Sequence, residues 1–494
     1  PPPPPPLFVS RGMDFYHHAS SLRRVIPTVV SISRGVPRGA SVYNDDDNDG
    51  VIDSEDAFPI DPTEVSDGDG DGIGDNADAF PDDASRQYVD MADAIAGIQD
   101  DRLRRCVENA SGGLSTAGEL TGIDCNYQEV RSLEGLQAFT NLRDLRLDGS
   151  CRRLDLTPIG RLTKLDYLGL GWDRGCENDD WSFRRDLTPL EDLRQLRALH
   201  INGGAVSDIT PLATLANLRE LRVGWNQDIQ DYEPLANLTR LTDLELNNNG
   251  IKSIPTLGSG SSLRMISMGE NPITDLSNLP ELPALESINL SNTEIADLSP
   301  LSGSPSLNYL DARNSRLESV MLSDLPELRS LGLSDNQIKA VAFDNVPQLN
   351  WLDLSNNEMT GFEGLESLGN LSDLYLQNNK ITDLSSLKAV LENTRLSQLD
   401  LRANEVTAIG DALDAMTEGS LDLSGNPLLC TALDSFKANK SRGLRFTFNG
   451  ECEVDTDGDG VVDSRDAFPS DPAASVDNDF DGAPDFWNEG NTES

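Results

Sequence analysis

Between residues 118 and 426, apolar and polar positions follow one recurring pattern, L-x-x-L-x-L-x-x-N-x-I. Clear copies read LTDLELNNNGI, LNWLDLSNNEM and LSDLYLQNNKI, and most copies follow one another after 21 to 23 residues. The x-L-x-L-x centre has a period of two, which predicts one short strand per copy with its leucines on one face. The first leucines of the thirteen complete copies stand at 120, 142, 165, 196, 218, 241, 263, 285, 307, 328, 349, 371 and 396, and LDLSGNPLL is a partial fourteenth.

A single strand of this kind cannot bury its own leucines, so neighbouring copies must stack and cover one another. The spacing lies in the range of leucine-rich repeats, and the repeated sequence resembles the bacterial class of about 22 residues, typified by internalins. The resemblance implies an α/β fold: a leucine-rich repeat solenoid with a parallel β-sheet on its concave face. It also implies a binding scaffold and not an enzyme.

The asparagine at the ninth position of the pattern is expected to hydrogen-bond backbone groups where the chain leaves the sheet, since a buried turn would otherwise leave amides unpaired. These residues are Asn226, Asn249, Asn271, Asn336, Asn357, Asn379, Asn404 and Asn426.

The two ends of such an array must be closed. Ile95, Ile98, Leu103 and Val107 recur at roughly helical spacing, which predicts an amino-terminal cap over residues 86–119. Residues 427–452 are predicted to form the carboxy-terminal cap, and residues 120–426 the repeats between them.

Acidic residues outside the array fall on a regular grid. Residues 45–83 contain sixteen Asp or Glu and no Lys or Arg. The frame D-x-D-x-D-G-x-x-D-x-x-D occurs three times and partly a fourth time. This spacing is typical of a calcium loop, in which carboxylates converge on a hard cation and the glycine permits a sharp turn. The expected ligands are Asp45, Asp47, Asp49, Asp53 and Asp56; Asp67, Asp69, Asp71, Asp75 and Asp78; Asp455, Asp457, Asp459, Asp463 and Asp466; and Asp477, Asp479, Asp481 and Asp485, where Asn488 replaces the last acid.

The alternative for these segments is a solvated acidic tail without ions. The sequence DAFP follows three of the loops, and its proline prevents the flanking helix of an EF-hand. The loops resemble bacterial thrombospondin type 3 repeats. This resemblance implies calcium-binding repeats with little regular secondary structure over residues 45–85 and 453–494, with calcium in place of a hydrophobic core.

Composition narrows the classes of partner. The 494-residue chain has a formal net charge of −45, which argues against nucleic acid and anionic membranes as ligands. No apolar run approaches the length of a transmembrane helix. Residues 1–44 begin with six prolines and fit neither repeat type, so we expect a disordered or non-native segment, and a chain that is a fragment.

Six cysteines occur as three local pairs. Cys106 with Cys125 and Cys430 with Cys452 would staple the two caps. Cys151 and Cys176 would meet on adjacent loops of stacked repeats. Three disulfides would indicate an oxidising, extracellular compartment, whereas the alternative is six reduced thiols, because Cys125 falls on a core position.

Solvent-facing positions of the early repeats carry large aromatic and basic residues with glycines between them. Such residues often anchor interfaces, although they could equally cover apolar turn edges or solvate the sheet. A 31-residue third repeat, with Trp181 in its extra loop, lies beside them. The expected ligand-binding residues are Tyr127, Arg146, Tyr167, Trp172, His200, Arg222 and Trp225. Trp172 and Trp225 would flank a gap of roughly 10 Å above basic strand centres, which favours a carboxylate-bearing ligand.

Catalytic motifs are missing from the sequence: we find no H-E-x-x-H, no G-x-S-x-G and no phosphate-binding glycine loop. The sequence therefore predicts a non-enzymatic, secreted or cell-surface protein that binds calcium and recognises a protein or a glycan. Two alternatives stay open, the non-catalytic targeting region of a larger secreted hydrolase and a structural surface stalk. The identity of the ligand and the oligomeric state do not follow from the sequence.

Overall fold

A computed structural model describes residues 47, 49–70, 72, 74–76, 82, 89–150, 154–171, 185–258, 262–394, 396–458, 462–477, 484 and the backbone of 486–487. The chain divides into two compact units, with the boundary between Ser66 and Asp67. The first acidic loop belongs to the first unit, and the whole repeat array belongs to the second.

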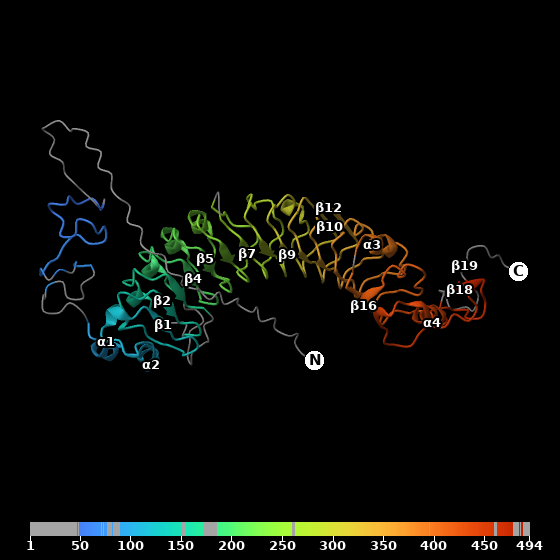
Figure 1. Ribbon diagram of the computed structural model, residues 1–494, viewed down its shortest axis with the longest axis horizontal. Coiled ribbons are helices and arrows are strands. Elements are labelled where there is room, and N and C mark those ends of the chain that lie inside the picture. Colours follow the sequence, from blue (N-terminus) through green and yellow to red (C-terminus); the bar gives the residue numbers. More distant parts are fainter. Residues whose placement is uncertain are drawn as a thin grey trace, which may run out of the picture. The chain divides into compact units, whose positions relative to one another are not determined.

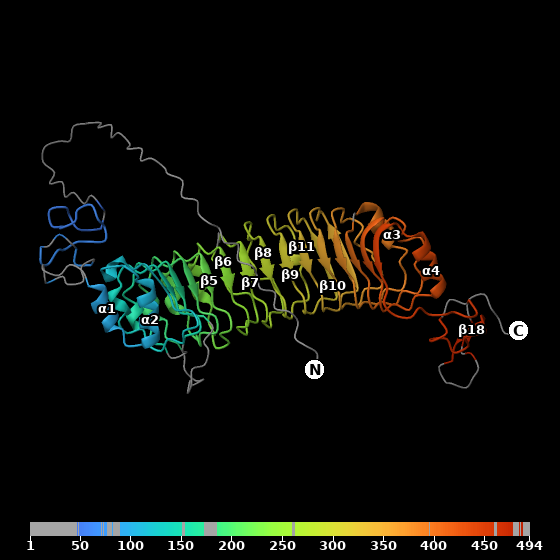
Figure 2. The ribbon, with the colours of Figure 1, turned by 60° about the horizontal axis from the view of Figure 1, so that its bottom comes forward.

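One long parallel sheet runs through the array, with one strand from each repeat (Figures 1 and 2). The strands pair with their neighbours without a register shift, so that Leu145, Leu168 and Leu199 lie side by side. In order across the sheet they are β1 (Gly122–Asp124), β2 (Asp144–Arg146), β3 (Tyr167–Gly169), β4 (Ala198–His200), β5 (Glu220–Arg222), β6 (Asp243–Glu245), β7 (Met265–Ser267), β8 (Ser287–Asn289), β9 (Tyr309–Asp311), β11 (Ser330–Gly332), β13 (Trp351–Asp353), β14 (Asp373–Tyr375), β15 (Gln398–Asp400), β16 (Glu418–Asp422) and β17 (Gly443–Thr447).

The predicted solenoid is confirmed, including one strand for the partial fourteenth repeat, β16. The central leucine or isoleucine of each strand is buried, because the period of two turns it away from solvent. The sequence did not predict β17, which lies beyond the last repeat and pairs in parallel with β16.

The segments opposite the sheet are short helices and a small second sheet. Strands β10 (Ser319–Ser323) and β12 (Ala340–Asp344) pair there in parallel. Among the described residues there are seven 3₁₀ helices, and in five of them proline in the first turn pre-sets the helical backbone, which suits these one-turn segments. The 3₁₀ helices are η1 (Ala117–Glu119), η2 (Leu136–Ala138), η3 (Thr157–Ile159), η4 (Thr188–Leu190), η5 (Thr210–Thr214), η6 (Glu233–Asn237) and η7 (Ser299–Leu301), and α3 spans Leu387–Asn393.

The predicted ladder of buried asparagines is also confirmed. The Nδ2 of Asn357 donates to the carbonyl oxygens of Leu333, Leu354 and Ser355 at 3.0–3.1 Å, and its Oδ1 accepts from the amide of Ile338 at 2.9 Å. The equivalent residues make the same kind of contacts from Asn226 onward. Each asparagine side chain therefore ties its own turn to the preceding repeat.

The early repeats lack this asparagine, and one of them uses an arginine in its place. The ninth position is Gln128, Ser150 or Gly204 in three of the first four repeats. Beside Gly204, the guanidinium of Arg185 is almost fully buried and donates to the carbonyl oxygen of Leu170 at 3.0 Å. Leu170 is the counterpart of Ile201, whose carbonyl accepts from Asn226 in the next repeat. A Cβ on residue 204 would lie 3.4 Å from Nη1 of Arg185, so the glycine leaves room for the arginine.

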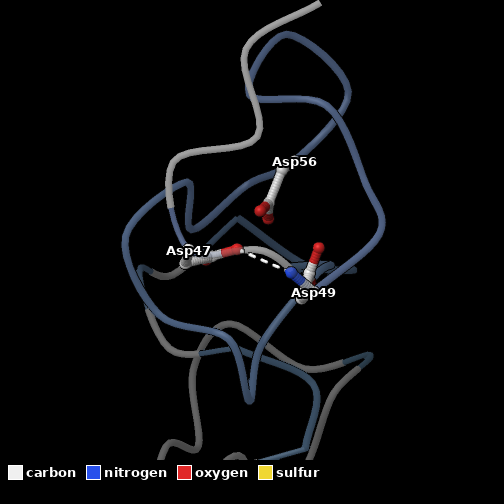
Figure 3. Close-up of side chains that lie close together, drawn as sticks. All are labelled: Asp47, Asp49 and Asp56. Atoms are coloured by element: carbon white, nitrogen blue, oxygen red, sulfur yellow. Dashed lines mark hydrogen bonds between the residues drawn. The ribbon is translucent and has the colours of Figure 1, made fainter.

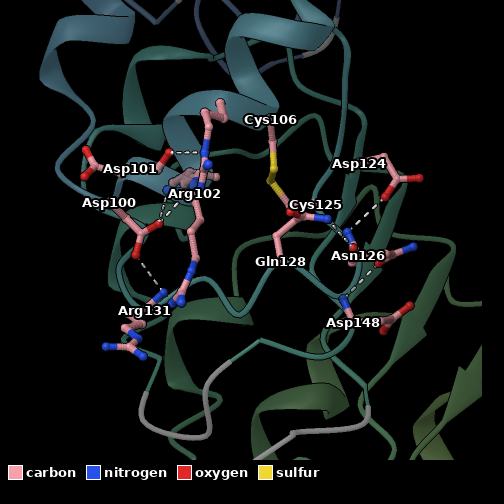
Figure 4. The surroundings of a disulfide bond; sticks show 12 residues. Asp100, Asp101, Arg102, Cys106, Asp124, Cys125, Asn126, Gln128, Arg131 and Asp148 are labelled. Carbon is pink, nitrogen blue, oxygen red and sulfur yellow. Dashed lines mark hydrogen bonds between the residues drawn. A yellow bond between two sulfur atoms is a disulfide. The ribbon is translucent and has the colours of Figure 1, made fainter. Parts of the chain in front are cut away.

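The amino-terminal cap consists of two helices, α1 (Met91–Gly97) and α2 (Asp101–Ala110). The carboxylate of Asp100 caps α2 by accepting from the amides of Arg102 and Leu103 (Figure 4). Its second oxygen accepts from the amide of Arg131, which joins the cap to the first repeat. The predicted disulfide between Cys106 and Cys125 links α2 to the turn after β1, with Cα atoms 5.6 Å apart.

The carboxy-terminal end contains α4 (Cys430–Asn439) and the strand β17. The predicted disulfide between Cys430 and Cys452 is present, with a Cα separation of 4.9 Å. Beyond it, β18 (Ala474–Val476) and β19 (Phe486–Trp487) form a short antiparallel pair. Residues 1–44, Cys151 and Cys176 lie outside the described residues. Within the described chain, no helix has the length and apolar character needed to cross a bilayer.

Candidate recognition face and cation loops

Three of the predicted ligand-binding residues form one connected group on neighbouring strands. The hydroxyl of Tyr167 on β3 lies 2.9 Å from Nδ1 of His200 on β4, and the two rings meet edge to face with centroids 5.0 Å apart. The other nitrogen of His200 lies 2.9 Å from Oε1 of Glu220 on β5. Arg222 contacts the same carboxylate, with Nη2 2.6 Å from Oε1. Strands β3, β4 and β5 therefore carry a connected network of side chains and not separate ones.

Two glutamates that were not among the predicted site residues neutralise the basic side chains of this network. Glu220 lies between His200 and Arg222, and the hydrogen bond with His200, aided by the charge of Arg222, lowers the pKa of Glu220 below its usual value. Glu245 on β6 lies 3.9 Å from Nε of Arg222 and accepts from Asn202 at 2.9 Å. The strand centres that the sequence predicts to be basic are thus a row of ion pairs. Register alone could have revealed Glu245, because it is directly opposite Arg222 in the next strand.

Arg146 extends the network towards the amino-terminal cap. Its guanidinium makes two hydrogen bonds with Asp144, at 2.9 and 3.0 Å, and its central carbon lies 4.9 Å from the ring centroid of Tyr167. Burial, together with the charge of Asp148, raises the pKa of the Tyr167 phenol to about 12. Tyr167 therefore stays neutral and can offer a ring face and a hydroxyl at any physiological pH.

Tyr127 and Trp225 lie just beyond their strands, β1 and β5. Both follow the carboxyl end of their strand, at the eighth position of the repeat. Tyr127 is 64% exposed and Trp225 39% exposed. Their φ angles are 60° and 62°, in the left-handed region that bulky residues avoid. The two residues therefore project from the edge of the sheet on a strained backbone.

The eighth position is left-handed in every repeat where the structure describes it, and residues other than aromatic ones usually fill it. It is asparagine or glycine in most of the described repeats, and these residues adopt this conformation at little cost. Gly149 supplies one such position and also makes room for Tyr127, since a Cβ there would lie 3.0 Å from Cδ1 of that ring. A residue other than glycine or asparagine here costs roughly 1–2 kcal/mol of backbone strain, a cost that Glu270 and Ala403 share with the two aromatic residues.

Trp172 and Trp181 lie outside the described residues, so the predicted gap between Trp172 and Trp225 stays a prediction. A second group of aromatic residues, Tyr309, Trp351 and Tyr375, lies on the strands β9, β13 and β14. Trp351 and Tyr375 pack together there, with ring centroids 5.8 Å apart.

The first acidic loop brings three carboxylates together (Figure 3). One oxygen from each of Asp47, Asp49 and Asp56 lies within 4.8 Å of the other two. Asp56 is buried, and one of its oxygens accepts from the amide of Phe58 at 2.8 Å. Its other oxygen is buried and meets no hydrogen-bond donor among the described residues. Such an oxygen is costly unless a cation binds it, so this donor set suits a hard metal ion.

The third loop repeats this geometry. Asp466 is buried at the position equivalent to Asp56, and it accepts from the amide of Phe468 at 2.7 Å. Its second oxygen is likewise buried and meets no donor in the described part of the chain. The glycine of the frame has φ of 101° at Gly50 and 91° at Gly72, as the sharp turn requires.

Several expected ligands lie outside the described residues: Asp45, Asp71, Asp78, Asp459, Asp479, Asp481 and Asp485. Among the described ones, Asp75 and Asp463 each accept from a backbone amide across their loop, at 2.6 and 2.7 Å. Asp67 and Asp455 also match one another, since each accepts from the amide of the glycine three residues on, at 2.8 and 2.7 Å. The second and third loops thus share one backbone arrangement.

The fold is a leucine-rich repeat solenoid. A family model described as "Leucine Rich repeats (2 copies)" matches residues 261–303 and 347–389. No curated protein matches the chain significantly in sequence. An internalin from Listeria monocytogenes is similar in structure, with 21% identity and a TM-score of 0.49 over 68% of this chain and 97% of the other. A leucine-rich repeat protein of Leptospira interrogans gives 18% identity and 0.49 over 69% and 98%. A chain of the Toll–Spatzle complex of Drosophila gives 16% and 0.49 over 67% and 46%.

Proposed function

We propose that this protein is a secreted or cell-surface recognition protein that binds another protein through the early repeats. The observation that carries the proposal is the pair of strained aromatic residues, Tyr127 and Trp225. They occupy a turn position that costs free energy for a bulky side chain, at the edge of a rigid parallel sheet. Exposed aromatic side chains held in one place lose little conformational entropy on binding, which makes them effective anchors.

The network between Tyr167 and Arg222 supports recognition of a polar protein surface. Its charges are paired within the face, so they offer hydrogen-bond donors and acceptors in fixed positions without a strong net field. Fixed partners lower the entropic cost of making further hydrogen bonds. The network therefore favours specificity, while the aromatic edge supplies most of the affinity.

The acidic loops are proposed to bind calcium. The converging oxygens of Asp47, Asp49 and Asp56, and the buried, unsatisfied oxygens of Asp56 and Asp466, support this assignment. Loops rich in carboxylates commonly bind calcium at micromolar to millimolar concentrations, and the weaker part of this range is typical of extracellular modules. Together with the two disulfides, this supports an oxidising compartment outside the cell.

The test of the recognition function is a binding screen of the full chain against extracellular proteins and glycans, followed by affinities of a selected partner for variants. Trp225→Asn should weaken binding by about 2 kcal/mol if this indole is an anchor. Trp351→Asn removes the same side chain from a later strand and should bind normally. An equal loss from both variants, or no loss from either, would contradict the proposal.

The test of the calcium loops is calorimetric titration of the full chain with calcium, before and after treatment with a chelator. Asp56→Asn and Asp466→Asn should each remove one site, because they take a charge from a buried ligand position. Glu55→Gln removes the same charge beside the first site, from an exposed residue off the ligand grid, and should leave uptake unchanged. The repeat array has its own apolar core and should keep its thermal transition when calcium is removed. No calcium uptake near millimolar concentration would reject the assignment.

A further inference from the structure

A basic cleft lies at the amino-terminal ends of the strands, where the chain enters the sheet. Five cationic residues line a cavity of about 210 Å³ there: Arg143, Lys164, Arg197, Arg219 and Arg240. Asp166 is the only carboxylate in its lining. We propose that this basic cleft binds an acidic segment of a protein partner. The proposal deepens the recognition function and rests on it.

Backbone hydrogen bonds fix the spacing of the basic residues. Arg143, Asp166, Arg197 and Arg219 each stand directly before a strand. The amide of Asp166 donates to the carbonyl of Arg143, that of Arg197 to Asp166, and that of Arg219 to Arg197, each at 2.8 Å. The four residues are therefore consecutive rungs, about 4.8 Å apart. Thr242 continues the series with the same bond to Arg219. The row of charges is rigid at its base.

The cations of the cleft are held without being neutralised. Lys164 donates to Oδ1 of Asn141 at 2.8 Å, and Arg240 donates to Oδ1 of Asn217 at 2.6 Å. Both acceptors are neutral amides. The guanidinium groups of Arg143 and Arg219 have no side-chain partner among the described residues. The ion pair of Arg197 with Asp166, with 3.2 Å between Nε and Oδ1, is the single compensation within the lining.

Elsewhere on the array, arginines of the sheet face are paired with carboxylates. Arg313 contacts Asp311 at 2.6 Å, and Arg402 contacts Asp400 at 2.6 Å. Arg264, on the rung after Thr242, is held by Glu286 at 2.9 Å. In a chain of net charge −45, a group of five cations with one carboxylate partner in the lining stands out against this pattern. A local positive potential on an acidic molecule attracts an anionic partner and orients it.

The occupant that fits is a peptide segment with spaced acidic residues. The lining is almost wholly polar, so it offers carboxylates several donors and offers apolar side chains no contact. Asp166, on the rung between Arg143 and Arg197, would repel a chain that is charged along its whole length. It can instead accept a backbone amide of an extended peptide. The exposed amide of Gln195 can both donate to and accept from such a backbone.

The test uses a fluorescent peptide of alternating Glu and Ser, titrated with the full chain in calcium-containing buffer. We expect binding that weakens as salt is added, and no binding of the same peptide with Gln in place of Glu. The variant Arg143→Gln/Arg219→Gln should bind the acidic peptide about tenfold more weakly, a change of about 1.4 kcal/mol. Arg329→Gln is the matched control, because Arg329 stands at the same repeat position before β11. It should bind as the unaltered chain does.

Three outcomes would overturn the assignment. The first is equal loss in the double variant and in Arg329→Gln, which would show non-specific attraction. The second is heparin that binds more tightly than the peptide with the same dependence on Arg143 and Arg219, which would assign the cleft to a sulfated polysaccharide. The third is self-association of the chain that the double variant abolishes, because an acidic loop of a second copy would then be the occupant. None of these results bears on the Trp225→Asn comparison, so the recognition function would be judged separately.

Discussion

The early and late repeats of the array share one backbone and differ in what they place on it. In the late repeats, asparagines at the eighth position form an exposed ladder: Asn378 donates to Asn356 at 2.7 Å, and Asn356 donates to Asp335 at 2.9 Å. The early repeats put Tyr127 and Trp225 at the same position and lose these bonds.

The buried side of the turn shows the same contrast. Most later repeats have an asparagine there, with Thr293 and Ser315 in two of them, whereas three of the first four have Gln128, Ser150 and Gly204. The hydroxyl of Ser150 is buried and meets no partner among the described residues. The late repeats are therefore the more regular half of the solenoid. The early repeats lack most of the asparagine hydrogen bonds at these two positions and have other side chains there. Departures from a repeat consensus mark where to look for function.

The largest expected effect concerns the buried turn. Asn357→Ala should lower the free energy of unfolding by about 3 kcal/mol, because it leaves buried backbone groups of two repeats unpaired. Arg185→Ala should cost about 2 kcal/mol for the same reason at Leu170. If Arg185 replaces the missing asparagine, then Gly204→Asn should restore stability in the Arg185→Ala chain.

Urea denaturation followed by circular dichroism measures these changes. Asn356→Ala is the control, since Asn356 is exposed and its side chain bonds only exposed side chains, donating to Asp335 and accepting from Asn378. It should cost well under the loss at Asn357. A failure of Gly204→Asn to rescue, with Asn357→Ala behaving as expected, would mean that Arg185 has a different role.

A smaller effect of opposite sign is expected at the exposed edge. Trp225→Asn should raise the free energy of unfolding by about 1 kcal/mol, because asparagine tolerates the left-handed backbone. The same change should weaken partner binding. The reverse change, Asn378→Trp, should destabilise the chain, since it adds strain and removes the bond to Asn356. Thermal unfolding of both variants measures these changes. If Trp225→Asn lowers the stability, the packing of the tryptophan stabilises the fold by more than its backbone strain costs.

The smallest expected effect is a pH dependence at the network of the early face. The folded state lowers the pKa of Glu220. Its contribution to stability is therefore present above the ordinary glutamate pKa near 4.5 and is lost as the pH falls below it. Because the group is partly exposed, this contribution should stay below about 1 kcal/mol. Urea midpoints between neutral pH and pH 3 or so should fall less steeply for Glu220→Gln than for the unaltered chain. Parallel slopes would show that Glu220 is not coupled to folding.

The sequence predicted the solenoid because its signal is local and repeated: a leucine at every second strand position and an asparagine at the turn. It also predicted the two stapled caps, since those cysteines stand close together in the chain. It did not predict the pairing of Arg222 with Glu220, two residues earlier on the same strand, or with Glu245, which depends on the register between neighbouring repeats. The basic cleft was missed because its residues are scattered over four repeats and share only their place before a strand.

The two disulfides close the ends of a stack in which each repeat contacts only its neighbours. A stack of this kind ordinarily frays from its termini, because a terminal unit has one neighbour and an internal unit has two. Here a covalent loop of 19 residues holds one end and a loop of 22 residues holds the other. The weakest junction is thereby moved inward, so a protease should make its first cut within the array at an internal turn and not by peeling off a cap.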